Sequence, residues 1–372
     1  MSDRQVAFDT TVARLGVAGP HVYVAELAQA LRPLLGDRFR PIATSLARLP
    51  TGGRRAGDRL RTLGRDLWWH QIGVTRAARR AGASLLHLPA GVGPIQPRMS
   101  TVVTIHDLAV LAFPEFFPRW FRHYARVVLP RLARAADAIL TGSQAAKADI
   151  VHTLGVPEHR VAVVPNGVDP AFAPLPEGSE RDQEVLRRFG LPRDFVLTVG
   201  SREPRKNLPR LLEALRLLRS RAGMDDVTLV HAGPEGWLAD DLPAMVRRLG
   251  LTDAVRFLGY VSREDLVVLY GMARLLAYPS LYEGFGLPVV EAMACGCPVL
   301  TSNVSALPEV TGDAGWLVDP GSVEEIAEGI AALWSDAELR RTLAARGRAR
   351  ARCFSWERTA RETAAVYDRV LP

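Results

Sequence analysis

The sequence predicts an α/β protein made of two doubly wound domains, each with a parallel sheet covered by helices on both faces. Short apolar runs typical of buried strands alternate with segments whose apolar residues recur at helical spacing, which favours parallel sheets. The alternation forms two series, separated by a stretch that contains Pro170, Pro174 and Pro176. A length of 372 residues is enough for two domains with separate cores.

The first series occupies residues 1–168. Strands are expected at 5–11, 41–46, 84–89, 101–105, 138–141 and 161–165, with helices at 66–81, 119–136 and 144–154. A turn with Gly16 and Gly19 follows the first strand and suggests that backbone approaches a ligand there, although it lacks the dinucleotide fingerprint Gly-x-Gly-x-x-Gly.

Ligands of doubly wound sheets bind beyond the carboxyl ends of the strands. His106 follows the strand at 101–105 and is therefore a candidate site residue, with Asp107 expected to fix its tautomer. The alternative for His106 is an ordinary loop residue. His87 lies inside an expected strand and serves equally well as a buried structural residue.

The second series has strands expected at 195–200, 227–233, 255–260, 274–279 and 298–301, with helices at 207–221, 238–249 and 262–272. Arg205 and Lys206 fall between its first strand and a helix for which Asn207 is the expected N-cap. Cations at this place suit a diphosphate, whereas a solvated basic pair would be disfavoured by the helix dipole. Lys206 and Lys147 are the chain's two lysines among 47 basic residues.

A glycine-rich turn at 282–297 follows the expected strand at 274–279. Gly284 and Gly286 allow a sharp backbone turn, and Pro288 suits the first turn of a helix, whose free N–H groups form an anion site. Glu283 and Glu291 lie on either side of this turn. The alternative is an ordinary strand-to-helix turn with two surface glutamates.

Composition argues against a membrane-spanning protein, a secreted protein and a disulfide-stabilised protein. No run of eighteen apolar residues is present, the first residues lack the apolar core of a signal peptide, and Cys295, Cys297 and Cys353 suit a reducing cytoplasm. Residues 1–168 contain 22 basic and 11 acidic residues, a balance of +11. This balance suits peripheral association with the inner face of an anionic membrane, or it reflects arginine-rich coding. No nucleic-acid-binding signature accompanies it, so no nucleic-acid partner is expected.

Five motifs in order resemble glycosyltransferase family 4, whose members are retaining enzymes of the GT-B fold. They are Thr-Ile-His-Asp-Leu (104–108), Val-Pro-Asn-Gly-Val-Asp (164–169), Val-Gly-Ser-Arg-Glu-Pro-Arg-Lys-Asn-Leu (199–208), Glu-Gly-Phe-Gly-Leu-Pro-Val-Val-Glu (283–291) and Phe-Ser-Trp-Glu (354–357). The resemblance implies two Rossmann-like domains that face each other across a cleft, with a C-terminal helix crossing back to the N-terminal domain. The expected domains are an acceptor domain, 1–168 with 354–372, and a nucleotide-sugar domain, 169–353.

The resemblance also implies roles for the candidate residues. Lys206, Glu283 and His106 would be catalytic, with Glu283 at the transferred sugar and His106 contacting that sugar from the opposite domain. Glu291 would bind the ribose, and Arg205 would bind the diphosphate with Lys206. Further backbone contacts to the donor are implied for a set of loop residues: Gly16, Gly19, Gly284, Phe285, Gly286 and Leu287.

The implied function is transfer of a hexose with retention of configuration, and the motif variants favour mannose from GDP-mannose. The acceptor would be a saccharide, a lipid-linked or a small-molecule compound. Alternatives are a UDP-glucose-dependent or another UDP- or ADP-sugar-dependent enzyme, and a non-catalytic sugar-nucleotide-binding module. No Asp-x-Asp motif is present, so we expect no metal and no cofactor beyond the donor itself. A nicotinamide dehydrogenase is excluded because neither domain has the dinucleotide fingerprint.

Overall fold

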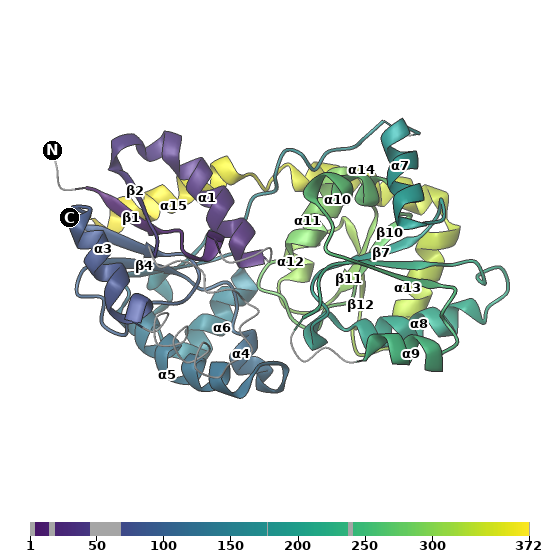
Figure 1. Cartoon of the computed structure of the whole chain (residues 1–372), viewed down its shortest axis with the longest axis horizontal. Helices are drawn as coiled ribbons and strands as arrows, with labels where there is room; N and C mark the ends of the chain where they lie inside the picture. Colours follow the sequence, from purple (N-terminus) through teal and green to yellow (C-terminus); the bar gives the residue numbers. More distant parts are fainter. Residues whose placement is uncertain (1–3, 15–18, 45–67, 177, 237–240, 372) are drawn as a thin grey trace. The chain divides into compact units, whose positions relative to one another are not determined.

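The computed structural model describes residues 4–14, 19–44, 68–176, 178–236 and 241–371 (Figure 1). The chain divides into two compact units, one made of Met1–Leu111, Arg119–Pro165 and Trp356–Pro372, the other of Ala112–Pro118 and Asn166–Ser355. The sequence placed the boundary after residue 168. Val168 falls in the second unit, where it forms an isolated bridge with Ser355 and its N–H donates to the Phe354 carbonyl at 3.3 Å.

The first unit contains a parallel sheet of six strands in the order β2-β1-β3-β4-β5-β6. The strands are β1 (Val6–Asp9), β2 (Phe39–Ile42), β3 (Leu85–Leu88), β4 (Ser100–Thr104), β5 (Ala138–Thr141) and β6 (Val161–Val163). Its main helices are α1 (Gly19–Leu35), α3 (Val74–Arg80), α5 (Arg119–Ala135), α6 (Gln144–Leu154) and α15 (Trp356–Val370), with a short α4 (Ala109–Ala112) at the unit boundary.

Helices cover both faces of this sheet. Side chains from α1 and α15 form one apolar cluster with the strands, and side chains from α3, α5 and α6 form another. Strands buried on both faces need continuous apolar runs, which is why β3 and β5 could be recognised in the sequence. Helix α15, the last in the chain, lies beside α1 in this first unit, as expected (Figure 1).

The second unit has its own parallel sheet of six strands, in the order β12-β11-β10-β7-β8-β9. The strands are β7 (Val196–Val199), β8 (Leu229–Ala232), β9 (Val255–Gly259), β10 (Leu275–Tyr278), β11 (Val299–Ser302) and β12 (Gly315–Val318). The helices are α7 (Glu180–Phe189), α8 (Leu208–Arg219), α9 (Leu242–Arg248), α10 (Arg263–Met272), α11 (Leu287–Cys295), α12 (Leu307–Thr311), α13 (Val323–Ser335) and α14 (Ala337–Ala351).

Two parallel, helix-covered sheets confirm the predicted α/β class. Strand β12 was not predicted. It is an edge strand, paired only with β11 in the sheet order, and Trp316 and Leu317 on it are 36% and 38% exposed. A short, partly exposed edge strand carries a weaker apolar signal than a central one, so sequence reasoning missed it.

The strand order reverses in the middle of the second sheet. From β7 the chain proceeds outward to β8 and β9, and it then returns to the other side of β7 to form β10, β11 and β12. The gap between the carboxyl ends of β7 and β10 is therefore the topological switch point, where doubly wound sheets bind ligands.

Two glycines allow the loops beside the switch point to approach each other. Gly200 follows β7 and Gly233 follows β8 with φ of 156°, and a Cβ added to Gly233 would lie 1.9 Å from the Gly200 carbonyl oxygen. The backbone at Gly200 cannot move away without disturbing the end of β7. Position 233 therefore requires glycine.

We expect Gly233→Ala to destabilise the second unit by at least about 2 kcal/mol, because a backbone clash adds to an unfavourable φ. Thermal unfolding followed by circular dichroism measures the loss. Gly271→Ala is the matched control, since Gly271 lies in α10 and a Cβ there would meet none of the described heavy atoms within 4 Å. An equal effect of the two substitutions would contradict the close approach.

Candidate functional site

Two loops that start from adjacent strands meet at the switch point of the second sheet. The first runs from β7 through a 3-10 turn (Pro204–Lys206) into α8, and the second runs from β10 into α11. The Leu281 N–H donates to the Arg205 carbonyl oxygen at 2.8 Å, and the Ser280 hydroxyl lies 3.0 Å from the same oxygen. These contacts tie together residues far apart in the sequence.

The Glu283 carboxylate is the centre of this site. Its Oε1 accepts from Lys206 Nζ at 2.6 Å, Ser280 Oγ at 2.7 Å and the Tyr278 hydroxyl at 2.8 Å. Its Oε2 accepts from Arg205 Nη1 at 2.8 Å. The Glu283 residue is 7% exposed, so the site joins a buried anion to two cations and two hydroxyls.

The charged groups of this cluster shift one another's pKa values. Burial alone would raise the pKa of Glu283, but the positive charges of Arg205 and Lys206 lower it to about 2. Burial and the neighbouring Arg205 lower the pKa of Lys206, and Glu283 opposes that shift. At neutral pH Glu283 is therefore an ionised carboxylate, bonded to two basic side chains.

Backbone geometry positions Lys206. A Cβ on Gly200 would lie 3.3 Å from Lys206 Cε, so the absence of a side chain there makes room for the lysine stem. Asn207 occupies the N-cap position of α8, as expected, but its side chain forms no cap hydrogen bond. Asn207 instead adopts a φ of 61°, and its Nδ2 donates to the carbonyls of Pro279 and Pro320 at 3.0 and 2.7 Å. Asn207 thus ties the end of the Lys206 turn to two other loops.

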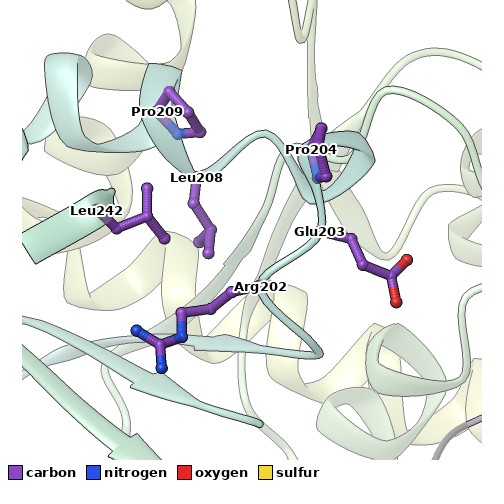
Figure 2. A pocket seen from close by; sticks show the side chains of 6 residues that line it. All are labelled: Arg202, Glu203, Pro204, Leu208, Pro209 and Leu242. Carbon is purple, nitrogen blue, oxygen red and sulfur yellow. The ribbon is translucent and has the colours of Figure 1, made fainter. Parts of the chain in front are cut away.

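A small cavity adjoins this turn, with a volume of about 10 Å³. Figure 2 shows its lining, which consists of Arg202, Glu203, Pro204, Leu208, Pro209 and Leu242. This volume is close to the room that one water molecule needs, so the cavity is not a nucleotide site. In Figure 2 the Glu203 carboxylate points away from Leu208 and Leu242. It bonds to Arg205 Nε at 3.1 Å and to the Ser201 hydroxyl at 2.5 Å.

The predicted glycine-rich turn forms the start of α11. Gly284, Phe285 and Gly286 are buried, and Gly286 has a φ of 102° just before Leu287, the first residue of the helix. The Phe285 ring packs edge-on against Phe354 at 5.5 Å between centroids, within the apolar core. Phe285 can therefore offer a ligand backbone groups while its side chain stabilises the unit.

Glu291 lies one turn into α11, apart from the Glu283 cluster. Its Oε2 accepts from the Tyr270 hydroxyl at 3.0 Å. Burial raises the pKa of Glu291 to about 7, although Tyr270 and the positive charge of Arg263 oppose the shift. Arg263 also forms an ion pair with Asp169. The two glutamates thus differ in protonation, with Glu283 ionised and Glu291 close to its midpoint at neutral pH.

His106 belongs to the first unit, two residues after β4. Its Nε2 lies 3.0 Å from the Pro89 carbonyl, which can only accept, so Nε2 carries the proton and Nδ1 is the acceptor nitrogen of the neutral ring. Asp107 was expected to fix this tautomer, but its Oδ1 accepts from the Ala109 N–H instead. Burial lowers the pKa of His106, against the opposing effects of Asp107 and Pro89, which favours neutral imidazole.

The remaining predicted residues of the first unit fall into two groups. Gly16 lies outside the described residues, and Gly19 is the first residue of α1. His87 is fully buried, with Nδ1 at 2.5 Å from the Tyr367 hydroxyl and Nε2 at 2.8 Å from Thr104 Oγ1. Both ring nitrogens are bonded within the protein, so His87 is a structural residue that links β3 to β4 and α15.

Sequence reasoning missed two residues that contact Glu283, and a third, Glu203, that contacts Arg205. Tyr278 was placed inside the expected strand at 274–279, Ser280 was given no role, and Glu203 was quoted only as part of a motif. Tyr278 is the last residue of β10 and Ser280 follows two positions later, at the carboxyl end of the strand, where doubly wound sheets carry ligand-binding groups. Polar residues at that position were the available signal.

The described part of the chain offers neither a metal-binding cluster nor a membrane-spanning helix. It contains no cluster of three or more histidine, cysteine, aspartate or glutamate side chains that could hold a metal ion. It also contains no helix that is both long and apolar enough to span a membrane.

Comparison with known proteins identifies the family. Residues 17–172 match the family described as Glycosyltransferase Family 4, and residues 182–350 match Glycosyl transferases group 1. The chain is 38% identical over 267 residues to the O-antigen chain mannosyltransferase B of Escherichia coli, covering 72% of this chain and 69% of that protein. It is 31% identical over 275 residues to the serotype-specific mannosyltransferase WbdA of Escherichia coli, covering 73% of this chain and 34% of that protein.

Comparison with solved structures identifies the fold. The crystal structure of Anabaena HepE in complex with UDP and glucose is similar with a TM-score of 0.75 and 21% identity, covering 98% of this chain and 99% of HepE. At this identity the similarity shows the fold, which is GT-B. Three findings therefore agree. They are the matches to the two family models, the relative that is aligned over two thirds of its length, and the two parallel sheets. The chain belongs to the family 4 glycosyltransferases and is a hexosyltransferase.

Proposed function

We propose that this glycosyltransferase transfers mannose from GDP-mannose to a saccharide acceptor, with retention of configuration and without a metal ion. The names of two Escherichia coli relatives, both mannosyltransferases, support the choice of sugar. The printed name of the first, an O-antigen chain enzyme, supports a saccharide acceptor in polysaccharide biosynthesis.

The observation that carries the proposal is the pair of cations at the switch point of the second sheet. Lys206 Nζ and Arg205 Nη1 lie at the carboxyl end of β7, bonded to one carboxylate at 2.6 and 2.8 Å. When the bond between a sugar and a diphosphate breaks, negative charge grows on the leaving phosphate. Two preorganised cations stabilise this charge and can replace a divalent metal ion in that role.

In this proposal Glu283 holds groups in place and does not act as a base. Its pKa of about 2 makes it a very weak proton acceptor, and its oxygens already accept from four donors. We therefore assign retention to departure and attack on the same face of the sugar. The bond between the anomeric carbon and the phosphate oxygen breaks, the acceptor oxygen bonds to that carbon, and the acceptor proton passes to the leaving phosphate.

Three further roles complete the proposal. Glu291 accepts hydrogen bonds from the ribose hydroxyls of the donor, and backbone groups of Gly284, Phe285, Gly286 and Leu287 contact its phosphate and sugar. His106 contributes as a neutral imidazole with Nδ1 as acceptor. A cytoplasmic location and peripheral association with an anionic membrane stay predictions from composition and from the +11 charge balance of residues 1–168.

A UDP-glucose or another UDP- or ADP-sugar donor is the alternative. The fold comparison with HepE does not decide between donors, because its 21% identity supports the fold alone. A non-catalytic sugar-nucleotide-binding module is less consistent with the chain, since Lys206, Glu283 and His106 are all present.

Activity against a panel of GDP-, UDP- and ADP-sugars, each assayed with and without EDTA, tests the proposal. We expect GDP-mannose to be the best donor and EDTA to leave its turnover unchanged, because Lys206 and Arg205 supply the positive charge. Release of the nucleoside diphosphate is the measurement. Preference for another sugar would refute the donor assignment, and loss of activity with EDTA would refute the metal-independent mechanism.

Substitution of Lys206 tests the role of the cations. We expect Lys206→Ala to lower kcat by about 100-fold or more, as for the loss of other charge-stabilising donors. Lys147→Ala is the matched control, because Lys147 is the other lysine and pairs with Glu158, whose side chain is 75% exposed. Thermal unfolding checks that both variants fold. Equal kcat values for the two variants would remove the assigned role.

The pH dependence of donor binding tests Glu291. Its pKa of about 7 means that it gains a proton as the pH falls through 7, and a protonated carboxyl accepts hydrogen bonds from ribose less well. We expect the donor KM to rise by up to about tenfold between pH 8 and pH 6. Glu291→Gln should have a high KM that changes little with pH. A parallel pH dependence in both proteins would assign the effect to another group.

A further inference from the structure

We propose that Glu203 is a positioning residue for Arg205, which it holds in the orientation that binds the donor diphosphate. The inference rests on the proposed function, because it takes Arg205 as a phosphate-binding residue. Nothing in the resemblance or in the comparisons assigns a role to Glu203.

Arg205 is bonded on two different edges of its guanidinium. Nε donates to Glu203 Oε2 at 3.1 Å, while Nη1 donates to Glu283 Oε2 at 2.8 Å and to the Tyr282 carbonyl at 3.2 Å. The guanidinium is rigid and planar, so bonds at Nε and at Nη1 together fix the plane and its rotation. The arginine side chain is 19% exposed, which leaves little other freedom.

Glu203 is well placed to act as the fixed partner. Its carboxylate is 8% exposed, and its Oε1 accepts from the Ser201 hydroxyl at 2.5 Å. Its main chain forms the turn that carries Arg205. The Glu203 N–H donates to the Ser201 carbonyl oxygen at 2.8 Å, and the Glu203 carbonyl oxygen accepts from the Lys206 N–H at 3.0 Å. A Cβ on Gly236 would lie 2.8 Å from Glu203 Cγ, so the stem of Glu203 is packed as well.

The two carboxylates beside Arg205 therefore do different work. Glu283 shares its charge between Arg205 and Lys206, and an arriving diphosphate competes with it for both cations. Glu203 contacts the opposite edge of Arg205, at Nε. The bond between Glu203 and Nε persists when Nη1 exchanges the Glu283 carboxylate for a phosphate of the donor. Glu203 thereby prevents Arg205 from losing its orientation during that exchange, which lowers the cost of binding the donor.

The same loop supplies a control pair. Arg202 Nη2 bonds to Glu235 Oε1 at 2.7 Å, again an arginine paired with a glutamate, but the Glu235 side chain is 80% exposed. This pair joins the loop to the segment that follows β8, and no role in donor binding is proposed for it. Removal of Glu235 therefore reports the effect of losing a nearby ion pair without changing Arg205.

The first test needs no nucleotide and so is independent of the proposed function. In proton–nitrogen NMR spectra, the Arg205 Nε–H signal is identified by its loss in Arg205→Lys. We expect this proton to exchange slowly with water in the wild type and in Glu235→Ala, and at least about tenfold faster in Glu203→Ala, because its acceptor is gone. Equally slow exchange in Glu203→Ala would overturn the proposal.

The second test is a double-mutant cycle measured with the donor that the panel identifies. We expect Glu203→Ala to raise the donor KM about tenfold, as for loss of a charge-assisted hydrogen bond, and to leave the acceptor KM unchanged. Glu203→Gln keeps an acceptor oxygen and should restore part of the affinity. In the Arg205→Lys background, Glu203→Ala should add less than about twofold, since lysine has no Nε to hold.

Three outcomes would overturn the positioning role in this second test. Independent, multiplicative effects of Glu203→Ala and Arg205→Lys would show that Glu203 does not act through Arg205. Equal losses in donor and acceptor KM would indicate a general structural defect. Glu235→Ala should leave both KM values unchanged, and a loss as large as that of Glu203→Ala would likewise contradict a specific role.

Discussion

The interaction on which the site depends is the group of bonds to the Glu283 carboxylate. Removing one partner of a buried ion pair destabilises the folded protein by about 3–5 kcal/mol. Glu283, Lys206 and Arg205 therefore require one another. Tyr278 and Ser280 supply the additional hydrogen bonds that make the buried charge tolerable. Because its partners come from two loops, this one carboxylate holds both loops in place and also arranges the cations that the proposed chemistry uses.

Sheet topology explains why these two loops meet. Strands β7 and β10 are neighbours although β8 and β9 lie between them in the sequence, and the loops at their carboxyl ends leave the sheet in the same direction. The approach of Gly233 to Gly200 then brings the loop after β8 against the first of them. The absence of a side chain at Gly200 also leaves room for the stem of Lys206.

Some features of this protein can be predicted from the sequence and others cannot. Central strands such as β3 and β10 were recognised because burial on both faces requires continuous apolar runs, and Lys206, Glu283 and Glu291 were selected from their motifs. Asn207 is the N-cap residue of α8, but its side chain does not cap, because Nδ2 donates to Pro279 and Pro320 and Oδ1 accepts from Arg210. Glu203 was overlooked because its importance comes from a guanidinium whose orientation no motif describes.

The sequence by itself determined the α/β class, the two series of strands, the family and the charged residues of the second unit. These depend on local periodicity and on motifs read along the chain. Only the tertiary structure decided which charges pair, because Lys206 and Glu283 are 77 positions apart and meet through the strand order. It also decided their protonation: the pKa of Glu283 is lowered to about 2 by two cations, whereas burial raises that of Glu291 to about 7. Burial and distance set these values, and both arise only when the chain folds.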